Sequence, residues 1–278
     1  IASRGEVAIR IARAASALGL ESVAVYAPVD AKSLHTRFAT RALELPATAD
    51  PVAAYLDGQS LVHIARATGC DCVHPGYGFL AESAAFAGLC AANGLALVGP
   101  PAELLALFGD KVRARAFARS IGVPVIPGSE GPLASAEDAI AFARTIGYPV
   151  MLKAAAGGGG RGMRLVTAEA DLPDAFERCR GEAQAAFGDD AVFLERFVPG
   201  ARHIEVQLLA DAHGDVVHLY ERDCSVQLRN QKVVEIAPAP NLPAALRERI
   251  FADAVALARA TSFVNAGTVE FLVAPERG

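Results

Sequence analysis

The first hundred residues alternate between amphipathic helical segments and short apolar segments, and this alternation constrains the fold more than any other feature. A helix over residues 6–18 would place Val7, Ile11 and Leu18 on one face. The apolar run SVAVYAP follows, and the pairing of a helical pattern with a short strand recurs twice before residue 100. Successive βαβ units form a mainly parallel sheet covered by helices. The pattern therefore predicts an N-terminal Rossmann-like α/β domain that binds ligands at the carboxyl ends of its strands.

The residues after this domain predict a second unit that also mixes helices and strands. Pro100 and Pro101 end the first unit, and a helix over 102–120 begins the next. His213–Asp215 joins two long alternating runs, which is typical of a hairpin. The further elements expected are helices ending at Ile146 and covering 171–188 and 243–261, with strands over 148–155, 163–168, 192–198, 203–211, 216–227 and 267–274.

Composition excludes several classes of function. The 278 residues carry a net charge of −5, no Trp and no basic block, which argues against a nucleic-acid surface. No apolar run approaches the roughly 20 residues that cross a bilayer, and IASRGEVAIR lacks the apolar core of a signal peptide. The five cysteines are scattered, and Cys70 and Cys72 lack zinc-site spacing, so we expect reduced thiols in the cytoplasm or a mitochondrial matrix. Because the first residue is not Met, we expect a longer polypeptide.

Four consecutive glycines, Gly157–Gly160, lie in the run KAAAGGGGRGMRLV and carry a high entropic cost in an ordered element. A P-loop needs Lys-Ser/Thr and then a helix, whereas here the chain leads into a strand. A dinucleotide fingerprint also needs a following helix. A flexible linker is the third alternative, but two matched strands frame the run closely. This context favours a hairpin tip whose backbone N–H groups cover phosphate oxygens, with Lys153 adding a charge.

Seven motifs follow one another along the whole chain: SRGEVAIRI, HPGYGFLAE, GDKVRAR, KAAAGGGGRGMR, RHIEVQ, ERDCSVQLRNQKVVEIAPAP and AGTVEFL. Together they resemble the biotin carboxylase domain, the ATP-grasp component of biotin-dependent carboxylases. The resemblance implies an N-terminal domain over 1–104 and an ATP-grasp domain over 105–278, with an α+β lid at about 125–197. It also implies that the ATP-grasp domain is incomplete at its C-terminal end. The family's second magnesium glutamate, its catalytic arginine and the glutamate that deprotonates bicarbonate have no counterpart here.

The resemblance implies a ligase that carboxylates biotin in two steps. Bicarbonate attacks the γ-phosphate of ATP, bound with Mg²⁺ or Mn²⁺, and the resulting carboxyphosphate releases CO₂ to a deprotonated ureido nitrogen of biotin. The implied partners are a biotin carboxyl carrier domain and a carboxyltransferase domain, in one polypeptide or complex. A homo-oligomer is expected, without nucleic acid or membrane. The runs KVVEIAPAPNL and NAGTVEFLV favour pyruvate as the final acceptor, with an acyl-CoA as the alternative.

The same motifs imply a nucleotide site. Lys111 and Lys153 resemble the family's two phosphate-binding lysines, although the residues around Lys111 alone would favour an exposed helical lysine. Glu195 is the first residue of the segment 195–198, which resembles the family's adenine-contacting strand, and it would accept from the exocyclic amine. His203, taken alone, fits a structural histidine equally well. The implied ATP-binding residues are Lys111, Lys153, Gly157, Gly158, Gly159, Gly160, Glu195, Arg196, Phe197, Val198, His203, Gln227 and Asn230.

The run QLRNQK carries the implied catalytic residue. Lys232 resembles the lysine that serves bicarbonate and the transferred phosphoryl group, a role that suits a compact cation. Leu228 replaces the arginine that is usual in the family, and Asn230 stands where many members have His. Glu270 resembles one magnesium ligand, although a glutamate on the exposed face of a strand is the plainer interpretation. It lies between two core-facing residues and therefore points to the other face.

Two other functions fit parts of the sequence. The first is another ATP-grasp ligase that uses carboxyphosphate, such as a carbamoyl-phosphate-synthesising domain. The second is a non-catalytic nucleotide-binding domain. HPGYGFLAE, in which Tyr77, Gly78 and Glu82 resemble a cleft wall, weighs against the first, and the retained lysines weigh against the second. Biotin-stimulated, bicarbonate-dependent release of ADP distinguishes a biotin carboxylase from both.

Overall fold

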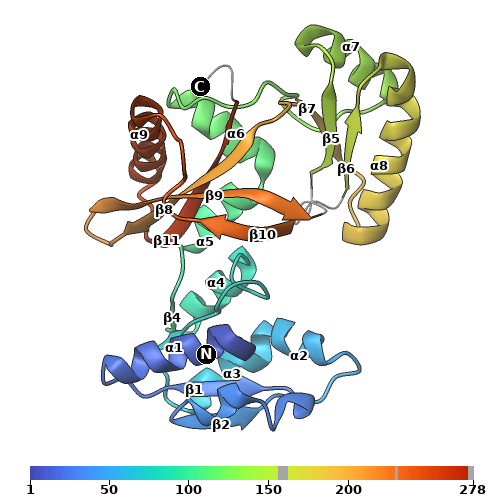
Figure 1. The fold of residues 1–278 in the computed structure, drawn as a ribbon. Helices are drawn as coiled ribbons and strands as arrows, with labels where there is room; N and C mark the ends of the chain where they lie inside the picture. The colour runs from blue at the N-terminus through green and yellow to red at the C-terminus, as the bar shows by residue number, and fades with distance from the viewer. Residues whose placement is uncertain (156–161, 229–230, 275–278) are drawn as a thin grey trace. The chain divides into compact units, whose positions relative to one another are not determined.

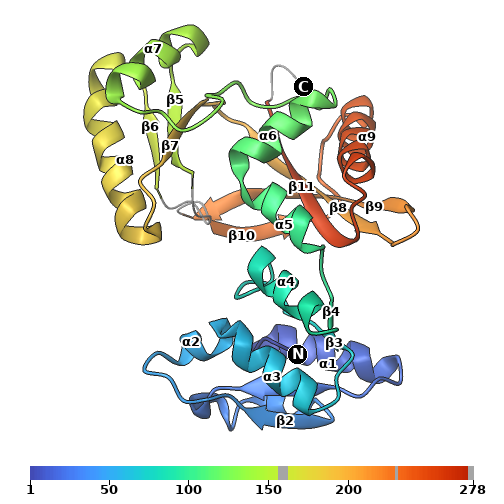
Figure 2. The same cartoon turned by 180° about the vertical axis from the view of Figure 1, so that it is seen from behind.

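The computed structural model describes residues 1–155, 162–228 and 231–274 (Figures 1 and 2). Contacts divide the chain into two compact units, Ile1–Gly109 and Asp110–Gly278. Each unit has its own sheets and its own buried apolar core. Among the described helices, none combines the length and the apolar character that a bilayer-spanning helix needs.

The first unit is an α/β domain with two short parallel sheets, as the alternation predicted. Helices precede, separate and follow its strands along the sequence. One of the strands, β2, was not predicted. The strand pairs are β1 (Val23–Tyr26) with β2 (Arg41–Glu44) and β3 (Cys72–Val73) with β4 (Ala96–Leu97). The helices are α1 (Gly5–Ala17), η1 (Pro28–Asp30), η2 (Leu34–Arg37), α2 (Pro51–Leu56), α3 (Gly58–Ala67), α4 (Ala84–Ala92) and α5 (Ala102–Gly109).

The extended residues Ile1 and Ala2 link the two sheets. The amino group of Ile1 donates to the carbonyl of Val23 in β1 at 2.7 Å. The N–H of Ala2 donates to the carbonyl of His74, directly after β3, at 2.9 Å. These backbone bonds place the end of β3, and with it the loop from His74 to Glu82, beside the start of α1.

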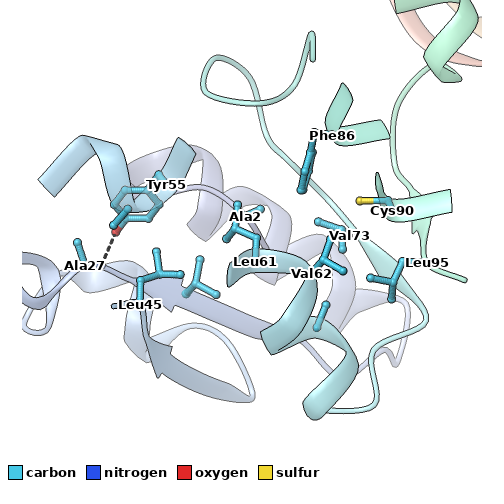
Figure 3. Close-up of a cluster of buried hydrophobic side chains, with 13 residues drawn as sticks. Ala2, Ala27, Leu45, Tyr55, Leu61, Val62, Val73, Phe86, Cys90 and Leu95 are labelled. Atoms are coloured by element: carbon cyan, nitrogen blue, oxygen red, sulfur yellow. Dashed lines mark hydrogen bonds between the residues drawn. The ribbon is translucent and has the colours of Figure 1, made fainter. Parts of the chain in front are cut away.

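Tyr55 anchors the core of the first unit (Figure 3). Its hydroxyl accepts from the N–H of Ala27 at 3.0 Å and donates to the buried carboxylate of Asp30 at 2.8 Å. The Tyr55 ring also stacks on Phe79 with ring centroids 5.2 Å apart. Because Phe79 lies in the HPGYGFLAE loop, this stacking fixes the loop on the core.

The predicted buried face of α1 is wrong at its end. Ala8 and Ala12 are the buried residues of this helix, whereas Leu18 is 75% exposed. The helix ends at Ala17, and Gly19 adopts a left-handed φ of +72°. The chain therefore turns away before Leu18 can continue the apolar face.

The single helix predicted over 102–120 is in fact two helices, α5 and α6 (Lys111–Ser120). Asp110 has extended backbone angles, and its side chain accepts from the N–H groups of Val112 at 2.9 Å and Arg113 at 3.1 Å. This N-cap starts a new helix because an aspartate competes for backbone donors and favours helix ends. Lys111 is consequently the first residue of α6.

The smaller sheet of the second unit has the strand order β6-β5-β7 and is antiparallel throughout. Two helices pack on each other and on this sheet, and their shared core includes Val150, Phe176 and Leu194. The predicted hairpin of strands around the glycine run is confirmed by the β5–β6 pairing. The elements are α7 (Ala136–Ile146), β5 (Val150–Ala154), β6 (Met163–Val166), η3 (Glu169–Asp171), α8 (Leu172–Phe187) and β7 (Val192–Arg196).

The larger sheet of the second unit has the order β10-β9-β8-β11 and is also antiparallel. One face carries α9, which packs against β8 and β9 (Figure 1). Alternation along β8 buries Ile204 and Val206 and turns His203 and Glu205 to the other face. The strand β10 was not predicted. The elements are β8 (Arg202–Ala210), β9 (Val216–Leu228), β10 (Gln231–Ile236), α9 (Ala244–Ala260) and β11 (Asn265–Val273).

Candidate functional site

One group of charged residues, most of them predicted, surrounds the side chain of Glu195 on β7, which is buried. Lys153 on β5 forms an ion pair with Oε2 of Glu195. Arg115 on α6 reaches the other oxygen, with its Nη1 3.3 Å from Oε1. One carboxylate therefore ties a helix residue to a strand residue. We call Lys111, Arg115, Lys153 and Glu195 the Glu195 group.

Lys111 belongs to this group through its helix position and its electrostatics. It precedes Arg115 by four residues in α6, so the two side chains lie on the same helix face. Burial and the nearby charge of Lys153 lower the pKa of Lys111, and Glu195 opposes that shift. The Glu195 group thus has three cationic side chains and one carboxylate. Such an excess of positive charge suits phosphate oxygens.

The backbone at the end of β7 is already bonded on both sides. The N–H of Arg196 donates to Pro127 at 2.8 Å, and the N–H of Phe197 donates to Pro149 at 3.0 Å. Within the described residues these donors are used inside the protein, and Val198 is the next donor along the chain. The Glu195 carboxylate faces its two cations, so a contact with an adenine amine would fall to a neighbouring backbone carbonyl.

A second group lies on the open face of the larger sheet, around Lys232 of β10. The Lys232 ammonium forms an ion pair with Oε2 of Glu205 and lies 2.9 Å from Oε1 of Glu270. Glu205 and Glu270 are register partners on β8 and β11, which brings their carboxylates together. Lys232 thus bridges two neighbouring strands. We call this set, with His203 and Arg222, the Lys232 group.

Hydrogen bonds fix the ring of His203 beside Glu270. The amide nitrogen of Gln227 lies 2.9 Å from Nδ1 of His203 and donates to the carbonyl of Cys224 at 2.9 Å. Since Nδ1 accepts this bond, the neutral ring carries its proton on Nε2. Nε2 lies 3.4 Å from Oε1 of Glu270 without hydrogen-bond alignment. The arrangement places the imidazole ring beside the Glu270 carboxylate without a hydrogen bond between them.

The neighbouring charges keep both carboxylates of the Lys232 group ionised. The contacts with His203 and Lys232 lower the pKa of Glu270 to about 2, against the effect of burial. Burial would raise the pKa of Glu205, but the bonds from Lys232 and Arg222 lower it. The pKa of Lys232 is raised, because its bonds to the two carboxylates outweigh its desolvation. Lys232 therefore remains a cation at neutral pH.

Sequence reasoning missed three charged residues of these groups, namely Arg115, Arg222 and Glu205. Arg115 lies in the quoted motif GDKVRAR, one helical turn after Lys111. Arg222 donates to Glu205 from its Nε at 2.7 Å and to Gln207 at 3.0 Å. The available signal was spacing: Arg115 follows Lys111 by four residues, and Glu205 follows His203 by two on the same strand face.

The two groups do not account for every predicted residue. Gly157, Gly158, Gly159, Gly160 and Asn230 are outside the described residues. Leu228 is 68% exposed at the end of β9.

In the first unit, Tyr77 and Glu82 are exposed in the loop after β3, where the hydroxyl of Tyr77 bonds to Glu6. Gly78, between them, has a left-handed φ of +70°.

The Lys232 group has the donor chemistry of a magnesium site. Ligand atoms of His203, Glu205 and Glu270 lie within 4.8 Å of one another. Magnesium binds carboxylate oxygens and is usually held by one or two of them plus phosphates and water. Both carboxylates are ionised, and a cation, the Lys232 ammonium, already lies between them. The set therefore fits this metal, with the half-exposed Glu270 as the more accessible ligand.

Curated relatives match almost the whole chain. The Caenorhabditis elegans protein "Pyruvate carboxylase 1" is 52% identical over 98% of this chain and 23% of its own length. The Bacillus subtilis "Pyruvate carboxylase" is 49% identical over 99% of this chain and 24% of its own length. The chain thus spans about a quarter of the length of these relatives.

Solved structures share the fold. A biotin carboxylase–beta-gamma-ATP complex from Campylobacter jejuni has a TM-score of 0.97 and 41% identity, over 100% of this chain and 62% of its own. The biotin carboxylase domain of a Hydrogenobacter thermophilus 2-oxoglutarate carboxylase, with MgADP, ADP and bicarbonate, has a TM-score of 0.95. It is 42% identical over 99% of this chain and 60% of its own. The mixed α/β fold with an ATP-grasp second unit is therefore confirmed.

Two families match consecutive parts of the sequence. The family described as "Biotin carboxylase, N-terminal domain" matches residues 1–105. The family described as "Carbamoyl-phosphate synthase L chain, ATP binding domain" matches residues 110–278. The chain therefore belongs to the biotin carboxylase family, in which that N-terminal domain precedes an ATP-binding domain of the carbamoyl-phosphate synthase L-chain type.

Proposed function

We propose that this chain binds MgATP in its second unit and carboxylates biotin with bicarbonate, as the biotin carboxylase part of a pyruvate carboxylase. The observation that carries the proposal is the pair of charge groups in one unit. The Glu195 group has an excess of cations for phosphates, and the Lys232 group holds a lysine between two carboxylates. The similar Hydrogenobacter thermophilus domain contains MgADP and bicarbonate, which are the ligands that these groups suit.

The Glu195 group would bind the phosphates. Lys111 and Lys153 would neutralise phosphate oxygens. The negative charge of Glu195 would attract both ammonium groups and offset the repulsion between them. The hairpin tip Gly157–Gly160 would cover the same oxygens with backbone N–H groups. The end of β7, over Arg196, Phe197 and Val198, would contact the adenine through backbone groups.

The Lys232 group would serve the reacting atoms. Lys232 would leave its carboxylates to contact bicarbonate and the transferred phosphoryl group, whose charge it can follow. Glu270 would hold magnesium, which when bound offsets phosphate charge and leaves Lys232 less tightly held by that carboxylate. His203, Gln227 and Asn230 would contact the nucleotide.

Further parts of the proposal concern the longer protein. A biotin carboxyl carrier domain and a carboxyltransferase domain would act on the same biotin, in one polypeptide or in a complex. We propose domains over 1–104 and 105–278 and a lid at about 125–197. A homo-oligomer in the cytoplasm or in a mitochondrial matrix completes the proposal. The five cysteines are free, which agrees with a reducing compartment.

A carbamoyl-phosphate-type ligase is the second candidate, because the ATP-binding family that matches residues 110–278 is described by that enzyme. The two reactions share carboxyphosphate and differ in the acceptor, which is biotin in one case and ammonia in the other. The match of residues 1–105 to the biotin carboxylase N-terminal domain favours biotin.

The test measures ADP release by the intact protein with MgATP and bicarbonate, with and without free biotin, and with ammonia in a parallel reaction. We expect biotin to stimulate ADP release only when bicarbonate is present, and labelled bicarbonate to appear in carboxybiotin. Stimulation by ammonia but not by biotin would replace the proposal with the second candidate. ADP release that ignores both acceptors would contradict each of them.

A further inference from the structure

Arg115 is held by the protein on three sides. Its guanidinium donates to the carbonyl of Ile126 at 2.7 Å, faces Glu195 at 3.3 Å, and lies 6.0 Å from the ring centroid of Phe193. The side chain is only 15% exposed. A guanidinium that gives up most of its hydration needs compensating contacts, and these contacts fix it in one place.

Gly128 leaves the space through which Arg115 reaches Glu195. Gly128 forms an isolated antiparallel bridge with Glu195. A Cβ atom on residue 128 would lie 2.6 Å from Nη2 of Arg115 and 2.7 Å from the carbonyl oxygen of Leu194. Real side chains do not approach so closely. The guanidinium therefore occupies space that the glycine leaves open.

The carboxylate of Glu195 is divided between two cations. Its Oε2 faces Lys153 and its Oε1 faces Arg115. Without Arg115, the carboxylate could rotate about its last bond and offer both oxygens to Lys153. The ammonium group of Lys153 would then move with the rotating carboxylate. At present it stays in place because each carboxylate oxygen faces a different cation. By this argument, Arg115 on α6 sets the position of the Lys153 ammonium group on β5 through Glu195 on β7.

We propose that Arg115 is a positioning residue for nucleotide binding, which fixes the Glu195 carboxylate and, through it, the ammonium group of Lys153. The inference rests on the proposed function, because that function gives Lys153 the nucleotide phosphates as its ligand. Nη1 faces Glu195 without hydrogen-bond alignment, so the contact is an ion pair that depends on charge more than on the geometry of the fork. A lysine at this position should consequently replace part of the effect.

The experiment measures the Kd of the fluorescent nucleotide mant-ADP with magnesium, and KM and kcat for ATP in biotin-dependent ADP release, on the intact protein. For Arg115→Met we expect Kd and KM to rise about tenfold, the size of one charged contact, with kcat within about twofold. Arg115→Lys should recover at least half of that loss on a logarithmic scale. In the Glu195→Gln background, Arg115→Met should add less than about twofold, because residues that act as a unit are not additive.

The matched control is Arg119→Met. Arg119 lies one turn further along α6 and forms an exposed ion pair with Glu130 at 3.4 Å. We expect this variant to keep both constants. If Arg115→Met fails to fold, Arg115→Lys carries the same cycle with Glu195→Gln.

Three results would overturn the positioning role while wild-type binding left the proposed function intact. They are equal Kd values for Arg115→Met and Arg119→Met, a tenfold loss that persists in the Glu195→Gln background, and a fall in kcat with unchanged KM. A wild-type protein that binds no nucleotide and releases no biotin-dependent ADP would instead overturn the proposed function, and this inference with it.

Discussion

The Glu195 group and the Lys232 group have opposite charge arrangements within the same unit. In the first, one buried carboxylate lies among three cationic side chains, and two of them are tied to it. In the second, one lysine lies between two carboxylates, and Arg222, which also pairs with Glu205, has its Nε 3.6 Å from Oε2 of Glu235. In the first arrangement, the carboxylate of Glu195 holds the cations in place, where an anionic ligand could bind them. In the second, the proposed function requires that a metal or an anion displace the lysine from its carboxylates. In the proposed function, the first group would bind the nucleotide and the second group would carry out the chemistry.

Replacing Lys232 should have the largest effect, because it removes the one cation that lies between the two carboxylates. For Lys232→Ala we expect biotin carboxylation to fall by about 10²- to 10³-fold, the range for losing one preorganised charge. The affinity for ATP should change little, because the Glu195 group is untouched. Incorporation of labelled bicarbonate into biotin measures the first quantity, and a nucleotide titration measures the second.

The control is Lys32→Ala, at an exposed lysine of the first unit. A collapse of ATP affinity in Lys232→Ala, with turnover intact at saturating ATP, would show that the roles of the two groups are exchanged.

The repeating patterns of the sequence predicted much of this architecture. The alternation in 1–109 gave parallel strand pairs, and the runs at 203–211 and 216–227 gave an antiparallel hairpin. The sequence also predicted that Lys153 lies near the end of a strand, as it does in β5. Composition offered a further signal: the chain has only four lysines, and three of them, Lys111, Lys153 and Lys232, lie in the two groups.

The contacts that build the groups could not be predicted in the same way. Arg115 meets Glu195 across 80 positions of sequence, and Glu205 meets Lys232 across 27. Pairing at such separations depends on strand register and on the open space at Gly128 that Arg115 occupies, which we call the slot. Neither feature has a periodic signature in the sequence. The strand β10 escaped because every residue in it is exposed, so no burial pattern marks it.

Filling the slot at Gly128 should have an intermediate effect and would sharpen the comparison, because the slot belongs to the Glu195 group alone. In Gly128→Ala the new methyl group would displace Arg115 and press on Leu194. We expect a loss of about 1–3 kcal/mol of unfolding free energy, typical of overpacking, and weaker binding of mant-ADP. Denaturant unfolding and the nucleotide titration measure the two effects.

Gly131→Ala is the matched control, because a Cβ there would have no neighbour within 4 Å. Equal unfolding curves for the two variants would mean that the slot tolerates a methyl group and that Arg115 is not confined by it.

The smallest effect concerns the ionisation of Glu270, whose pKa is lowered from 4.5 to about 2 by His203 and Lys232. A carboxylate with a depressed folded-state pKa adds stability that is present above the unfolded pKa and is lost as pH falls through the folded pKa. The contribution should therefore be constant above about pH 4.5 and decline from there toward pH 2. Since the side chain is 55% exposed, solvent screening should limit it to about 0.2–1 kcal/mol.

The measurement compares unfolding of the wild type and Glu270→Gln in EDTA, without nucleotide, from pH 7 down to the lowest pH at which both fold. Their difference in unfolding free energy should stay level to about pH 4.5 and then shrink. Glu248→Gln, at an exposed glutamate of α9, is the matched control. In the Lys232→Ala background the difference should be smaller at every pH, because one of the two groups that hold the carboxylate ionised is gone. A difference that grows as pH falls would mean that Glu270 is protonated where Lys232 bridges the strands, and the second group would then resemble the first in having an excess of cations.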